Sequence, residues 1–143
     1  MKASSIKQQG FTLIEIIVVV VIIGILATFV APKFMGKTDT ARITKAKSDI
    51  LSLESALDLY KLDNYAYPNT DQGLDALINR PTSDPVPTNW QEGGYIKKLQ
   101  KDPWQRDYLY LSPGEHGEID IYSLGADGIE GGEGPNADIG NWD

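Results

Sequence analysis

The chain has 143 residues, which is the size of a single domain, and it contains no cysteine, so it must fold without disulfide bonds. Its formal net charge of −7 at pH 7 argues against nucleic acid as a partner, because the phosphate backbone attracts basic surfaces. An acidic surface suits cations instead.

The first predicted element is an apolar helix over residues 11–31, which follows a short leader, residues 1–10, with Lys2 and Lys7. The run is broken only by Thr12, Glu15, Gly24 and Thr28. As a helix it would be about 31 Å long, the thickness of the hydrocarbon core of a bilayer. A soluble helix would show a polar face, so the pattern predicts a membrane span. A cleaved secretory signal is the alternative, although the small-residue site near Ala31 is weak.

A distinctive string, GFTLIEII, begins at Gly10 and places an acid at the fifth position after that glycine. It resembles the processing site of type IV pilins and type II secretion pseudopilins. The resemblance implies that a prepilin peptidase cuts after Gly10, methylates the new amine of Phe11 and leaves the apolar helix on the protein.

Glu15 is the one acid in the apolar run, and its position needs a physical reason. A carboxylate at bilayer depth costs about 2.5–3.5 kcal/mol and usually has a partner. Cleavage before Phe11 would create a positive amine one helical turn from Glu15. We expect Glu15 of one copy to face the Phe11 amine of a neighbouring copy, which would fix the register of packed helices. A carboxylate that reaches the membrane surface is the alternative.

Gly24 and Pro32 bracket a weak stretch at the end of the apolar run. Glycine is a poor helix former, and Pro32 removes a helical hydrogen bond and frees the carbonyl of Thr28. In related fibres this part of the helix unwinds on assembly, and these residues would permit it. A simple kink is the alternative.

The helix is expected to continue to about residue 62 with a different character. Apolar residues recur there at spacings of three and four, a one-sided stripe typical of a helix packed on a globular core: Ile43, Ala46, Ile50, Leu53, Leu57 and Tyr60. A free coiled coil would need more heptads.

The remainder predicts a small head with a short helix and strands. Thr70 is the expected cap of the short helix, with Leu74, Leu77 and Ile78 turned inward and Pro81 ending it. Residues 107–112 and 118–123 alternate as two strands of an antiparallel hairpin. Which face of the hairpin is buried cannot be read from the alternation. The order of elements predicts an α+β head, residues 32–143, with an antiparallel sheet of about three strands.

The C-terminal segment, residues 123–143, combines acids with six glycines and a proline, and it ends near two apolar residues that need cover. Its acids are Asp127, Glu130, Glu133, Asp138 and Asp143. A calcium ion would order such a loop, since Ca²⁺ accepts carboxylate and carbonyl oxygens in irregular geometry. The spacing is not that of an EF-hand, so a plain acidic turn stays an alternative.

Four further strings extend the resemblance to the end of the chain: YKLDNYAYPNTDQGLDAL, GGYIKKLQKDPW, YSLGADG and DIGNW. Together they are similar to the major pseudopilins of type II secretion systems. The resemblance implies Ca²⁺ bound by the carbonyl of Leu124 and by Asp127 and Asp138. Ala137 stands where other members have a second acid, so a further oxygen would come from Glu133 or a loop carbonyl.

The same resemblance implies a function and a location. The chain is expected to be a single-pass inner-membrane protein of a Gram-negative bacterium with its head in the periplasm. It would polymerise through its N-terminal helices into a pseudopilus that drives export of folded proteins across the outer membrane. The expected partners are other copies, minor pseudopilins, the inner-membrane secretion platform, the prepilin peptidase and the membrane, with no nucleic acid.

Two other functions compete with this one. A type IV pilin for adhesion or motility is the first, but such pilins commonly close their C-terminal region with a disulfide, and this chain has no cysteine. A membrane-tethered, calcium-dependent enzyme or binding protein is the second. The sequence has no nucleophile elbow, metalloprotease helix or phosphate loop, and its single histidine, His116, falls in a predicted loop, so we expect no enzyme.

Overall fold

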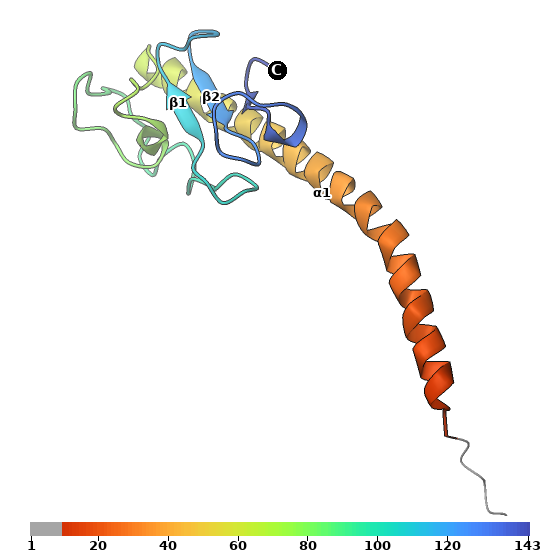
Figure 1. Cartoon of the computed structure of the whole chain (residues 1–143). Coiled ribbons are helices and arrows are strands. Elements are labelled where there is room, and N and C mark those ends of the chain that lie inside the picture. Colours follow the sequence, from red (N-terminus) through yellow and green to blue (C-terminus); the bar gives the residue numbers. More distant parts are fainter. Residues whose placement is uncertain (1–9) are drawn as a thin grey trace, which may run out of the picture. The chain divides into compact units, whose positions relative to one another are not determined.

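The computed structural model describes residues 10–143, except for the side chains of residues 29–35. Lys2 and Lys7 of the predicted leader therefore lie outside the described residues. The chain divides into two compact units, residues 1–38 and 39–143. Figure 1 shows the course of the chain from the long N-terminal helix into the head.

The dominant element is one helix, α1, which runs from Leu13 to Asn64. This confirms the helix expected over residues 11–62. Among the residues whose side chains the structure describes, no helix is long and apolar enough to cross a membrane. The segment expected to do so, residues 11–31, ends among side chains outside the described set, and its membrane span stays a prediction.

The second half of α1 carries the one-sided stripe that the spacing predicted. Ala46, Ile50 and Leu57 have almost no exposed surface, and Leu53 and Tyr60 are also buried. They form one core with residues of the strands and the short helix. Because side chains three and four positions apart share a helix face, this stripe is the surface on which the head packs.

The short helix differs from its prediction in type and in its start. It is a 3-10 helix, η1, of four residues, Leu74–Leu77, and both of these leucines are buried. Thr70 does not cap it, so that prediction was wrong. The Thr70 hydroxyl instead donates to the carbonyl of Ser112 at 3.0 Å and accepts from the Ser112 N–H at 2.9 Å. The turn before η1 is held by Asn69, whose side-chain oxygen accepts from the Gln72 N–H at 2.8 Å.

The sheet has three antiparallel strands in the order β1-β2-β3, as expected for the α+β head. Its strands are β1 (Leu109–Leu111), β2 (Asp120–Ser123) and β3 (Ile139–Gly140), which are shorter than the alternation suggested. Tyr110 faces Ile121 across the first pair, and Ser123 faces Ile139 across the second. The strands lie against the second half of α1 (Figure 1), where Tyr110 and Ile121 belong to the common core.

The hairpin between β1 and β2 shows which face is buried. Tyr108 and Tyr110 point into the core, whereas Leu109 is partly exposed. The tyrosine hydroxyls find acceptors there: Tyr110 donates to the carbonyl of Pro68 at 2.8 Å. Burial is the main cause that raises the pKa of Tyr110 to about 12, so this side chain stays neutral at physiological pH.

Asp120, which is only 1% exposed, holds the loop of the hairpin through hydrogen bonds. Its carboxylate accepts from the backbone N–H groups of Glu115 and His116, and His116 Nδ1 lies 2.9 Å from Asp120 Oδ2. The His116 ring in turn stacks on Trp142, with ring centroids 3.9 Å apart. His116 is therefore a packing residue, which links the hairpin loop to the C-terminus.

These contacts predict a pH-dependent contribution to stability. Burial alone would raise the pKa of Asp120, but the hydrogen bonds from His116 and Glu115 outweigh it and hold the pKa below the ordinary value of 3.8. A lowered folded pKa stabilises the fold above the unfolded pKa, and this contribution is lost as the pH falls through the folded pKa. Asp120→Asn should destabilise the detergent-solubilised chain by about 1–3 kcal/mol at pH 7, measured by urea unfolding.

The difference between Asp120→Asn and the unsubstituted chain should shrink as the pH is lowered below 3.8. Asp71→Asn, at an exposed position, is the control and should show little difference at either pH. A difference for Asp120→Asn that stays constant down to pH 2 would contradict this account.

Candidate functional site

The predicted processing site lies just ahead of α1. Gly10 and Phe11 precede the helix and are exposed, Phe11 to 83%. Large apolar side chains continue along the first turns of α1 and are all at least half exposed, from Leu13 to Leu26. In this unit, therefore, the chain presents apolar surface that its own described residues do not cover.

Glu15 closes the N-terminus of α1 through a capping box that sequence reasoning missed. Its Oε2 accepts from the Thr12 backbone N–H at 2.9 Å and from the Thr12 hydroxyl at 2.9 Å. The Thr12 hydroxyl in turn accepts from the Glu15 N–H at 3.3 Å. The Thr-Xaa-Xaa-Glu spacing at residues 12–15 is the signal that could have revealed it.

Gly24 and Pro32 both fall inside α1, whose helical assignment is continuous from Leu13 to Asn64. The Thr28 hydroxyl donates to the carbonyl of Gly24 at 3.0 Å, which is the usual way for a threonine inside a helix to satisfy its side chain. Unwinding on assembly, the proposed use of this stretch, concerns the fibre and stays a prediction.

The predicted calcium ligands lie in the loop between β2 and β3, which is closed by hydrogen bonds across its base. The Ala126 N–H donates to the carbonyl of Pro135 at 2.9 Å, and the Asp138 N–H donates to the carbonyl of Gly131 at 3.2 Å. Asp138 Oδ2 also accepts from the Gly131 N–H at 2.9 Å. These bonds fold residues 124–138 into a compact loop rather than an open tail.

The three predicted ligands have different surroundings. The Leu124 carbonyl accepts from the Gly128 N–H at 3.2 Å, which leaves one lone pair available. Asp127 is exposed, and its Oδ1 accepts from the Ile129 N–H at 3.0 Å. Asp138 is half-buried, and its Oδ1 is a buried oxygen with no hydrogen-bond partner among the residues that the structure describes.

The unpartnered oxygen of Asp138 is the observation that bears on a cation. A buried carboxylate oxygen without a donor loses the hydration that it has in water, and a bound Ca²⁺ would replace it. Within the described part of the chain, no group of three or more acidic, histidine or cysteine side chains is placed to hold a metal ion. The calcium ligand set that the resemblance implied, Asp127 and Asp138 with the Leu124 carbonyl, stays a prediction.

A buried scaffold positions the start of this loop. Asp102, only 1% exposed, accepts from the Ser123 hydroxyl at 2.6 Å and from the Arg106 N–H at 2.8 Å. The Arg106 guanidinium then donates to the carbonyl of Gly125. Sequence reasoning missed both roles. The only local signal for them is the Asp-Pro pair at residues 102–103, which is typical of a turn.

Gly125 is the position where the loop tolerates no side chain. Its φ is +63°, and a Cβ there would lie 2.5 Å from the carbonyl oxygen of Ala137. Gly131 also has a positive φ, +93°, but a Cβ there would meet no atom within 4 Å. A substitution at Gly131 would therefore add backbone strain alone, whereas one at Gly125 would add backbone strain and steric overlap.

We expect Gly125→Ala to destabilise the protein more than Gly131→Ala. Each substitution puts an L side chain at positive φ, which costs about 1–2 kcal/mol, and only Gly125→Ala adds an overlap with Ala137. Thermal unfolding of the full chain in detergent would measure both. Equal melting temperatures for the two variants would show that the loop opens freely at Gly125.

A methylation-type leader and long N-terminal helix ahead of a small α+β head define the class of pilin-like fibre subunits. The model of the prokaryotic N-terminal methylation motif matches residues 6–31, and the model of type II secretion system protein G matches residues 33–142. The chain belongs to the type II secretion system protein G family, the major pseudopilins.

Relatives support this assignment over nearly the whole chain. Type II secretion system core protein G of Vibrio cholerae is 63% identical, covering 95% of this chain and 92% of the relative. The protein of the same name from Pseudomonas aeruginosa is 60% identical, covering 96% of each. A crystal structure of the major pseudopilin of enterohaemorrhagic Escherichia coli is 50% identical, with a TM-score of 0.69 over 76% of this chain and 92% of that one. These matches favour the pseudopilin over the type IV pilin.

Proposed function

We propose that this chain is the major structural subunit of a type II secretion pseudopilus and drives export of folded proteins across the outer membrane. The observation that carries the proposal is the succession of two matches, the methylation motif over residues 6–31 and protein G over residues 33–142. Its role is structural rather than enzymatic. A cell that lacks the chain should lose type II secretion of its exported proteins and keep its twitching motility.

In this proposal the prepilin peptidase cleaves after Gly10, and the mature subunit is held in the inner membrane by residues 11–31 with its head in the periplasm. The exposed apolar side chains of α1, from Leu13 to Leu26, support it because they need a partner, either lipid or other copies. When copies polymerise, Glu15 faces the Phe11 amine of a neighbour. Minor pseudopilins and the inner-membrane secretion platform are the other partners of the fibre in this proposal.

The charge of Glu15 can be separated from its capping role. Glu15→Gln retains a capping box, since glutamine serves at this position, but it cannot neutralise an amine. Glu15→Val removes both. We expect both variants to insert in the membrane and to give at least about tenfold fewer fibres, because an unmatched buried charge costs several kcal/mol.

Fibre yield would be measured by shearing, sedimentation and electron microscopy, with membrane fractionation to check insertion. Thr12→Ala, which removes the capping hydroxyl but keeps the acid, is the control and should assemble well. Normal fibres from Glu15→Gln would show that Glu15 serves only as a cap.

We further propose that the loop between β2 and β3 binds Ca²⁺ through the Leu124 carbonyl, Asp127 and Asp138. The unpartnered Oδ1 of Asp138 supports it. In this chain a metal ion would supply the cross-link that a disulfide supplies elsewhere, since there is no cysteine. The ion would hold the C-terminal segment to β2 and would take no part in any reaction.

Calcium should therefore stabilise the fold and chelation should remove that effect. At a calcium concentration one hundred times the dissociation constant, the gain would be about 2.7 kcal/mol. The double variant Asp127→Asn/Asp138→Asn should unfold at the same temperature with calcium or with a chelator. Glu92→Gln, at an exposed position away from the loop, should respond like the unsubstituted chain. A calcium response that survives in the double variant would move the site elsewhere.

A further inference from the structure

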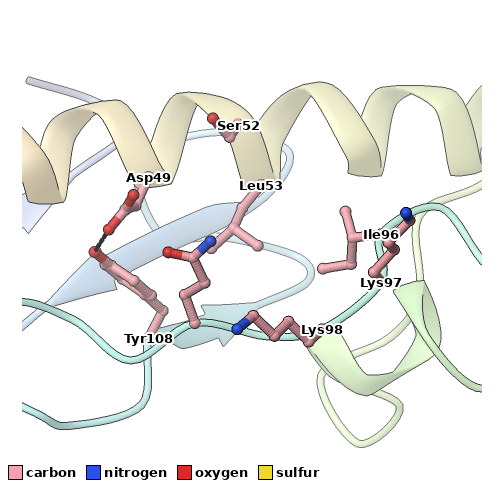
Figure 2. Close-up of a pocket in the computed structure, with 8 residues that line it drawn as sticks. Asp49, Ser52, Leu53, Ile96, Lys97, Lys98 and Tyr108 are labelled. Carbon is pink, nitrogen blue, oxygen red and sulfur yellow. Dashed lines mark hydrogen bonds between the residues drawn. The ribbon is translucent and has the colours of Figure 1, made fainter.

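A cleft of about 380 Å³ lies in the head between α1 and the segment that follows Tyr95. Its apolar walls come from Leu53 of α1, from Ile96 and from the ring of Tyr108. Figure 2 shows Leu53 pointing from α1 toward the segment that carries Ile96 and the two lysines after it. No role described above uses this cleft.

The polar groups at one end of the cleft are already paired. The Tyr108 hydroxyl donates to Asp49 Oδ2 at 2.9 Å, the contact drawn in Figure 2, and Lys45 forms an ion pair with the same oxygen at 2.7 Å. Because these groups satisfy one another, this end of the cleft needs no polar ligand. An apolar side chain is the better occupant.

The rim of the cleft is positively charged. Lys97 and Lys98 line it and are exposed, and neither has an ion pair with any residue that the structure describes. A hollow that shares Lys98 with the cleft is lined by Lys45 and Lys101 as well. Lys45 and Lys101 are already paired with aspartates, Asp49 and Asp107. Lys97 and Lys98 are therefore the groups that would attract an acidic partner, in a chain whose net charge is −7.

The same chain carries a surface of the complementary kind, the acidic loop 127–133. Ile129 is 68% exposed at this loop, between Asp127 and Glu130. Glu130 and Glu133 are exposed and form no ion pair within the described residues. None of these residues lines the cleft of its own copy, so one molecule does not satisfy both surfaces.

We propose that the cleft receives the acidic loop of a second copy, with Ile129 entering between Leu53 and Ile96 while Lys97 and Lys98 pair with Glu130 and Glu133. This inference rests on the proposed function, and it specifies a contact between the heads of neighbouring subunits in the fibre. The two surfaces differ, so the contact is heterologous and leaves a free cleft at one end of the array and a free loop at the other. Such a contact repeats without closing, which is what an elongating fibre needs.

The absence of cysteine makes the contact directly testable, because an introduced pair would be the only thiols in the chain. Lys98→Cys/Glu130→Cys should give a ladder of covalent multimers when assembled fibres are treated with a mild oxidant. Each single variant should give no multimers, since a heterologous contact does not bring a residue next to the same residue of a neighbouring copy. Lys98→Cys/Ser55→Cys, with its second thiol on an exposed position of α1, is the matched control.

Charge reversal provides a second measurement. Lys97→Glu/Lys98→Glu and Glu130→Lys/Glu133→Lys should each lower fibre yield by about tenfold, since each replaces attraction by repulsion across the contact. The combination of all four substitutions should recover most of the yield. Glu92→Lys/Glu115→Lys, which makes the same charge change at exposed positions outside the loop, should leave the yield close to that of the unsubstituted chain.

The outcomes separate this contact from the proposed function. Fibres that assemble but give no ladder through residues 98 and 130, or no rescue by the combined reversal, would overturn the contact and leave the fibre role intact. A ladder from the control pair in place of the test pair would put a neighbour's helix in the cleft and would also overturn it. A chain that forms no fibres before any substitution would remove the proposed function itself.

Discussion

The head depends on the burial of one face of α1. Ala46, Ile50 and Leu57 are almost completely covered, and the residues that cover them come from η1 and from the strands. The second half of a helix that is exposed elsewhere thereby becomes the central element of a core. Without this face the apolar side of the sheet would lose its cover, and strands of two to four residues depend on such packing for their stability.

Buried carboxylates then tie the loops to this core. Asp102 and Asp120 are each 1% exposed, and donors from hydroxyl, imidazole or backbone groups satisfy them. Asp138 follows the same pattern with one of its oxygens, which accepts from the Gly131 N–H. Its other oxygen is buried without a donor. Asp138 therefore differs from Asp102 and Asp120 in having one satisfied and one unsatisfied oxygen among the described residues, which is the feature that supports the proposed calcium site.

The sequence predicted the elements well and their local contacts poorly. The stripe from Ile43 to Tyr60 identified the helix and its packed face, since spacing alone determines which side chains share a face. The Thr70 cap was wrong because Thr70 bonds to Ser112, forty-two residues away, and no local pattern contains that contact. The buried face of the hairpin could not be predicted for another reason, because tyrosine and leucine side chains both suit a covered surface.

The candidate sites divide along the same line. The predicted calcium ligands were named from motifs, but the scaffold behind them was not predicted, because the contact from Arg106 to Gly125 joins segments that are distant in sequence. The capping box of Thr12 and Glu15 was local and could have been read. The sequence-based interpretation directed the acid to a neighbouring copy or to the membrane surface, and not to the start of its own helix.

The cap that Glu15 forms and its proposed pairing with the amine of a neighbouring copy are compatible, because a carboxylate has two oxygens. Both contacts with Thr12 use Oε2, and among the described residues Oε1 accepts no hydrogen bond. The cap therefore holds the side chain at the start of α1 and leaves one oxygen for a donor from a neighbouring chain. Cleavage after Gly10 would keep Thr12 in the mature protein and so preserve the cap. The cap would therefore order the Glu15 side chain in each subunit before assembly. Part of the entropy cost of fixing this side chain would then not fall on the contact between subunits.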